Sequence, residues 1–114
     1  MTIKQLQKLC HKQAIDKGFW NGEGFLSQEL VPRNNGELLM LIVSELGEAL
    51  EALRQNCRQE AGQKWRKDTF EDEVADSVIR ILDMAEALDI NLEWQISKKL
   101  AYNETRPHKH GKEF

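Results

Sequence analysis

The sequence has little of the residues that break helices or cross-link small domains. Its 114 residues include two prolines, seven glycines and two cysteines. With 40% hydrophobic and 31% charged residues, this composition favours a helical domain over a sheet or a disordered chain. Cys10 and Cys57 lack a C-x-x-C spacing, which favours two reduced thiols over a structural disulfide. The length suits one domain, residues 1–114, and is too short for two.

The chain also lacks a large net charge and a long apolar run. A formal charge of −3 gives no general attraction to nucleic acid or to an anionic membrane. No apolar run approaches the roughly 20 residues of a membrane span, and "MTIKQLQKLCHKQ" is too polar for a secretory signal. Basic patches at Lys64 to Lys67 and in the tail are short. We therefore expect a cytoplasmic protein with no membrane and no nucleic-acid partner.

Hydrophobic periodicity predicts an all-α, four-helix bundle-like domain with an irregular N-terminal loop. Its parts are an N-terminal helix and loop (1–36), metal- and phosphate-binding helices (37–106) and a basic tail (107–114). A Thr2-x-x-Gln5 capping box opens the first helix and Gly18 closes it. A short helical turn is expected to start at Ser27. The predicted helices are Thr2 to Lys17, Asn34 to Gln55, Asp68 or Thr69 to Leu88, and Asn91 to the residue before Pro107.

Apolar stripes give the faces that each helix is expected to bury. In the first helix and the third helix the stripes are Ile3, Leu6, Leu9 or Cys10, and Ala14, then Val74, Val78, Ile81, Leu82 and Ala85. The second helix has a broad apolar arc, made of Leu38, Leu41, Ile42, Leu46, Ala49, Leu50, Ala52 and Leu53. An arc around more than half of the helix is more than one layer can cover. A homodimer at least is expected, and a tetramer is compatible with the pattern.

Two acidic pairs stand out against these stripes. Glu45 falls inside the apolar arc and Glu48 lies at its edge, although a buried carboxylate costs several kcal/mol unless it is paired. Glu73 and Asp76 follow after a gap of 24 residues, so antiparallel packing would bring four carboxylates to one place. Oxygen ligands without thiols favour Mg²⁺, with Mn²⁺ second. The alternative for Glu73 and Asp76 is an ordinary solvated face.

The last helix carries a possible phosphate clamp. Lys99, Asn103 and Arg106 recur at i, i+4 and i+7 and so share one stripe. Two cations and an amide donor suit phosphate oxygens. The alternative is that these are ordinary residues near a helix C-terminus, where cations offset the macrodipole.

These three elements together resemble the MazG-like family of all-α nucleoside triphosphate pyrophosphohydrolases. The matching motifs are E-x-x-E at Glu45 and Glu48, E-x-x-D at Glu73 and Asp76, and K-x-x-x-N-x-x-R from Lys99 to Arg106. The resemblance runs from about Leu38 to Lys112, with fainter support from "KGFW".

The resemblance implies a helical bundle assembled as a dimer or a dimer of dimers. It implies that the four carboxylates hold Mg²⁺ and that an NTP or dNTP is cleaved to a monophosphate and pyrophosphate, as in house-cleaning of the nucleotide pool. Glu45 is our candidate base, because apolar surroundings should raise its basicity. Alternatives are a phosphoribosyl-ATP pyrophosphohydrolase-like enzyme and a non-enzymatic acidic helical interaction module.

Aromatic residues and the tail complete the candidate site. Phe19 and Trp20, in a glycine-rich loop, are candidates for contacting the nucleobase, with core packing as the alternative. Trp65 could assist from its loop or belong to an interface. For His108 and His110, a basic flap is a better interpretation than a metal site.

Overall fold

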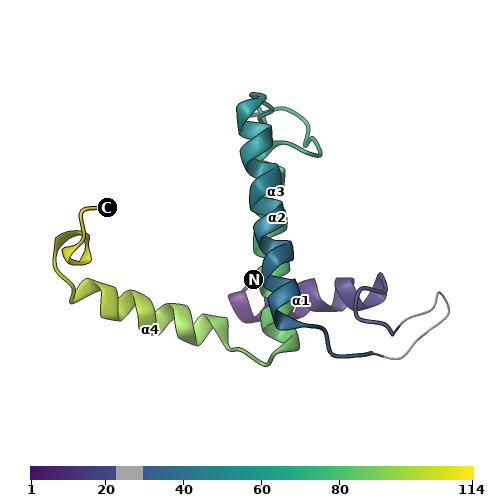
Figure 1. Cartoon of the computed structure of the whole chain (residues 1–114), viewed down its shortest axis with the longest axis horizontal. Helices are drawn as coiled ribbons and strands as arrows, with labels where there is room; N and C mark the ends of the chain where they lie inside the picture. The colour runs from purple at the N-terminus through teal and green to yellow at the C-terminus, as the bar shows by residue number, and fades with distance from the viewer. Residues whose placement is uncertain (23–29) are drawn as a thin grey trace.

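The computed structural model describes residues 1–22 and 30–114, and within them the fold is all-α (Figure 1). This confirms the predicted fold class, and the described residues contain no strand beyond an isolated bridge between Asn21 and Leu30. The predicted turn at Ser27 lies outside the described residues. The elements are α1 (Ile3–Asp16), α2 (Asn35–Arg54), α3 (Phe70–Ala87), α4 (Leu92–Glu104) and a short 3₁₀ helix, η1 (His108–Gly111).

The helices begin at the caps that the sequence predicts. Thr2 forms both halves of a capping box with Gln5, and three further side chains accept a hydrogen bond from a backbone N–H in the first turn. These three caps are Asn34, Thr69 and Asn91. A side-chain cap of this kind typically contributes about 1 kcal/mol. Gly18 follows α1 with a φ of +88°, which glycine adopts without strain.

An antiparallel pair of helices, α2 and α3, forms the centre of the molecule, and α1 packs across α3 (Figure 1). The buried side-chain amide of Gln7 lies at the α1–α3 contact. Its Nε2 donates to Glu86 Oε1 at 3.0 Å and to the Ile90 carbonyl at 2.7 Å. Both described cysteines are free thiols, as predicted. None of the helices in the described residues is long and apolar enough to cross a membrane.

The apolar residues of α2, those of the predicted arc and three others, form a buried stripe and an exposed stripe. The buried residues, Leu38, Ile42, Ala49 and Ala52, face the other helices, and Glu45 lies in register among them. The second stripe is about half exposed and consists of Leu39, Met40, Val43, Leu46, Leu50 and Leu53. A chain that leaves such a stripe open needs another surface to cover it.

The predicted stripes of α1 and α3 are wrong in part. In α1 the buried residues are Gln7 and Cys10, whereas Ile3, Leu6 and Leu9 stay 36–40% exposed. In α3 the valines are exposed, and the buried residues are Glu73, Ser77, Leu82 and Ala85. These polar groups tolerate burial because they have hydrogen-bond partners or belong to a common site. The Ser77 hydroxyl, for instance, donates to the Glu73 carbonyl at 3.0 Å. Periodicity alone assigns such groups to the outside.

The fourth helix stands apart from the α2–α3 pair (Figure 1). It contacts α1, and none of its residues is buried. The radius of gyration is 17.1 Å, against about 13 Å for a compact domain of this length. One chain therefore does not form the four-helix bundle that the sequence predicts, because α4 extends away from α2 and α3 instead of packing against them.

Candidate metal centre

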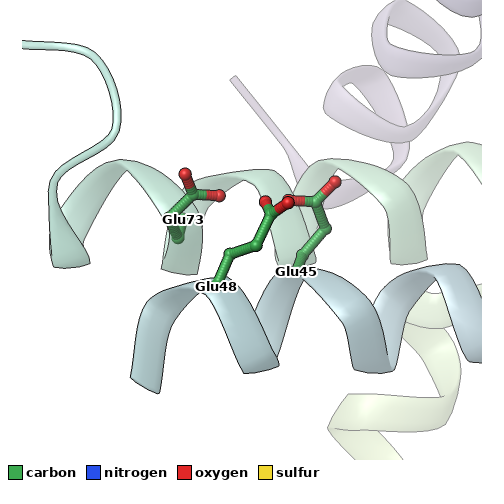
Figure 2. Close-up of side chains that lie close together, drawn as sticks. All are labelled: Glu45, Glu48 and Glu73. Atoms are coloured by element: carbon green, nitrogen blue, oxygen red, sulfur yellow. The ribbon is translucent and has the colours of Figure 1, made fainter. Parts of the chain in front are cut away.

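Three carboxylates converge where α2 and α3 run side by side. Glu45 and Glu48 project from α2 and Glu73 from α3, with one oxygen of each within 4.8 Å of the others (Figure 2). We call these three residues the carboxylate cluster. The antiparallel packing predicted from the two acidic pairs is what brings them together. The fourth predicted ligand, Asp76, is half-buried and lines the adjoining cavity together with Glu45.

Glu73 is the most buried member of the carboxylate cluster. Its exposed fraction is 6%, and its Oε2 has no hydrogen-bond partner among the described residues. Burial, followed by the neighbouring Glu48 and Glu45, raises the pKa of Glu73 to about 7. A solvated face is therefore the wrong interpretation of this residue. A buried acceptor without a donor, next to two further carboxylates, fits a site for a cation.

The pKa of Glu45 shifts in the direction opposite to the one that we expected. Burial acts to raise the pKa of Glu45, but hydrogen bonds, first from Arg80 and then with Glu48 and Glu73, outweigh burial and lower it. The Arg80 Nε donates to Glu45 Oε1 at 2.8 Å. The expectation that apolar surroundings raise the basicity of Glu45 is thus wrong, because Arg80 of α3 places a cation beside the Glu45 carboxylate.

Asp76 has the environment that we expected for Glu45. Burial raises its pKa, and the nearby Asp72 and Glu45 act in the same direction. It lies on the wall of a cavity of about 320 Å³ that opens beside the carboxylate cluster. A carboxylate with raised basicity in such a position can accept a proton from a bound water.

A second acidic group lies at the start of α3. Asp68, Asp72 and Glu73 each offer an oxygen within 4.8 Å. Local contacts account for two of them, since Lys67 Nζ lies 3.2 Å from Asp68 Oδ1 and Asp72 Oδ2 accepts the Asp68 backbone N–H at 2.8 Å. This group is the polar entry to the helix rather than a separate site.

The predicted phosphate clamp is not brought to the carboxylate cluster within one chain. Lys99 and Asn103 belong to α4 and Arg106 follows its end, and α4 extends away from the α2–α3 pair (Figure 1). Lys99 Nζ and Arg106 Cζ lie 5.0 and 5.5 Å from the centroid of the Tyr102 ring. The Asn103 Oδ1 is buried without a hydrogen-bond partner among the described residues. The phosphate clamp therefore stays a prediction.

The two predicted base-contacting aromatics have different positions. Phe19 lines the cavity and is 61% exposed, whereas Trp20 is buried and its Nε1 donates to Asp83. Trp65 is 67% exposed on its loop. The tail histidines, His108 and His110, are exposed in η1.

The sequence interpretation did not single out two residues of the cavity wall, Asp83 and Arg33. Asp83 accepts hydrogen bonds from His11 and Trp20. Arg33 lines the cavity and lies over the Trp20 ring. These contacts join segments up to 72 residues apart, and no local spacing signals them.

No protein-family model, curated protein or solved structure matches the chain.

Proposed function

We propose that the protein is a Mg²⁺-dependent nucleoside triphosphate pyrophosphohydrolase of the MazG-like kind. The observation that carries this proposal is the unpartnered Oε2 of buried Glu73, next to Glu45 and Glu48. Carboxylate oxygens, with no histidine or cysteine in the group, suit a hard divalent ion such as Mg²⁺, with Mn²⁺ as a substitute. The three motifs occur in the order and spacing that the family resemblance requires.

The residues have separate roles in the proposed reaction. Glu45, Glu48 and Glu73, with Asp76 beside them, would hold the metal, which when bound would neutralise phosphate charge and make a water more acidic. Asp76 accepts the proton of the water that attacks the α-phosphorus. The bond from that phosphorus to the bridging oxygen breaks, and pyrophosphate leaves with its charge balanced by cationic side chains.

We further propose that a second copy of the chain supplies those cations. The half-exposed stripe of α2 and the unburied α4 together leave a large apolar surface open. Lys99 on α4 and Arg106, just beyond the end of α4, carry charge opposite to that of the carboxylate cluster. A symmetric dimer in which each α4 lies across the other chain would cover both surfaces and complete both sites. A tetramer would be a pair of such dimers.

Light scattering should find at least a dimer at micromolar concentration. Leu50→Glu places a charge in the middle of the exposed apolar stripe of α2, and a buried unpaired charge is costly. We expect this variant to become monomeric or to associate at least about tenfold more weakly, because about 1.4 kcal/mol changes an equilibrium constant tenfold. Ser44→Glu adds the same charge to the exposed polar face of α2 and should leave the assembly intact. A monomeric wild-type protein would contradict the proposal.

The activity itself is tested by incubating the protein with each common NTP and dNTP in Mg²⁺. We expect a monophosphate and pyrophosphate as products, and no orthophosphate. The same ion should raise the melting temperature without nucleotide, because a ligand that binds only the native state stabilises it by mass action. An acidic interaction module would give neither product nor a Mg²⁺ effect. Activity on phosphoribosyl-ATP alone would favour the narrower enzyme.

A further inference from the structure

The cavity beside the carboxylate cluster has a polar wall that metal binding does not explain. Its volume of about 320 Å³ is within the range of small-molecule sites. Glu45 and Asp76 line it on the side of the carboxylate cluster, and Ala14, Phe19 and Ile79 provide apolar lining. The remaining polar lining includes Asp83 and Arg33, neither of which belongs to the carboxylate cluster.

Asp83 is held rigidly as a hydrogen-bond acceptor. Its Oδ1 lies 2.7 Å from His11 Nδ1 and accepts from Trp20 Nε1 at 3.0 Å, while its Oδ2 lies 3.2 Å from the same indole nitrogen. His11 and Trp20 line a separate hollow, so they approach Asp83 from outside the cavity. An ionised carboxylate has about four acceptor positions. These contacts do not use all of that capacity, so Asp83, which also lines the cavity, can accept from a further donor.

Arg33 is fixed by the same indole. Its guanidinium carbon lies 5.2 Å from the centroid of the Trp20 ring, and its side chain is only 18% exposed. Trp20, itself 6% exposed, thus positions a donor fork and an acceptor on the lining of one cavity. A flat heterocycle whose edge carries both donors and acceptors fits such a pair. Pre-organised polar groups discriminate well between ligands, because a mismatched ligand leaves these groups without a hydrogen-bond partner.

We propose that this cavity binds the base of the nucleotide and that Asp83 selects bases with an exocyclic amino group over uracil and thymine. The proposal rests on the proposed pyrophosphohydrolase function for the identity of its ligand. An amino group donates to a carboxylate, as in the Asp and Glu contacts to cytosine N4. At the position where cytosine carries its N4 amino group, uracil carries O4, which is an acceptor and cannot donate to the Asp83 carboxylate.

The test compares CMP and UMP, which differ only at the edge in question. Titration of the whole protein, followed by calorimetry, should give binding of CMP about ten- to a hundredfold tighter than of UMP. Asp83→Asn offers a donor as well as an acceptor and should bring this ratio to about one or invert it. Asp16→Asn removes a similar charge at an exposed position of α1 and should leave the ratio unchanged.

Each outcome separates the base selection from the hydrolysis. Equal binding of CMP and UMP by the wild-type protein would overturn the selection, whether or not Asp83→Asn folds. A preference that survives in folded Asp83→Asn would also overturn the role of that residue. Hydrolysis of dCTP and dUTP at equal kcat/KM would remove the selection and leave the pyrophosphohydrolase. Preferred binding of CMP with no triphosphate hydrolysed would support the selection and remove the pyrophosphohydrolase.

Discussion

Glu73→Gln is expected to lower kcat/KM for Mg²⁺-dependent hydrolysis by at least about 100-fold, because loss of an outer-shell partner of a metal already costs about 10–100-fold. The amide keeps the shape of the side chain but removes the charge of the most buried member of the carboxylate cluster. The measurement is pyrophosphate release at saturating Mg²⁺. Glu51→Gln, on the exposed face of α2, is the matched control and should retain activity.

The same variant should make the metal-free protein more stable at neutral and alkaline pH. The pKa of Glu73 is raised from 4.5 to about 7 in the folded state, so between these values the native protein binds more protons than the unfolded chain. The free energy of unfolding therefore falls as the pH rises through this window, and the loss persists above it. The amide that replaces this carboxyl group cannot ionise, so Glu73→Gln avoids that loss.

Thermal melting at pH 5 and pH 8, with and without Mg²⁺, checks the sign. Without metal, Glu73→Gln should melt above the wild type at pH 8 and close to it at pH 5. Mg²⁺ should raise the melting temperature of the wild type and have little effect on the variant. A variant that is less stable than the wild type at pH 8 without metal would show that Glu73 is a structural partner, and the metal centre would be lost with it.

Local signals in the sequence were sufficient for the helices and for the carboxylate cluster. Caps such as Thr2 and Asn34 act within one turn, so a short spacing identifies them. Glu45 was found because a charge stood among apolar residues, and Glu73 because an antiparallel partner helix had to meet it. Both inferences use only helical period and chain direction.

Features that depend on contacts between distant segments could not be predicted from the sequence. The link from Asp83 to His11 joins α3 to α1 and leaves no pattern in either segment. Arg80 reversed the expected effect on Glu45, because its side chain reaches across to α2. The direction of α4 depends on what covers it, which periodicity within one helix does not specify.

Arg106→Ala should lower kcat/KM by about ten- to a thousandfold while hardly changing the melting temperature, because a charge-assisted hydrogen bond contributes about 1.5–3 kcal/mol or somewhat more and a cation near a helix end only about 0.3–1 kcal/mol. Lys98→Ala is the matched control. Lys98 Nζ lies 5.8 Å from the Trp94 ring and Lys99 Nζ lies beside Tyr102, so the two lysines project from different faces of α4. Equal losses for Lys98→Ala and Lys99→Ala would remove the phosphate clamp.

Mixed dimers decide whether the clamp acts on its own chain or on its partner. Co-expression of a Glu73→Gln chain with an Arg106→Ala chain gives heterodimers in about half of the molecules. If α4 reaches across, each heterodimer has one site with both an intact carboxylate cluster and an intact Arg106. Activity should then recover to about a quarter of the wild-type value, although each parent alone is strongly impaired.

The control is a mixture of two chains that each carry a substitution in the carboxylate cluster. Glu73→Gln mixed with Glu48→Gln leaves every carboxylate cluster damaged, so no arrangement of α4 can restore activity. Were the clamp to act within its own chain, the first mixture would also stay inactive, because each chain would carry one defect in its own site. Recovery in the first mixture and none in the second therefore requires that α4 of one copy serves the carboxylates of the other. The departure of α4 from its own bundle would then be the geometry that builds the site.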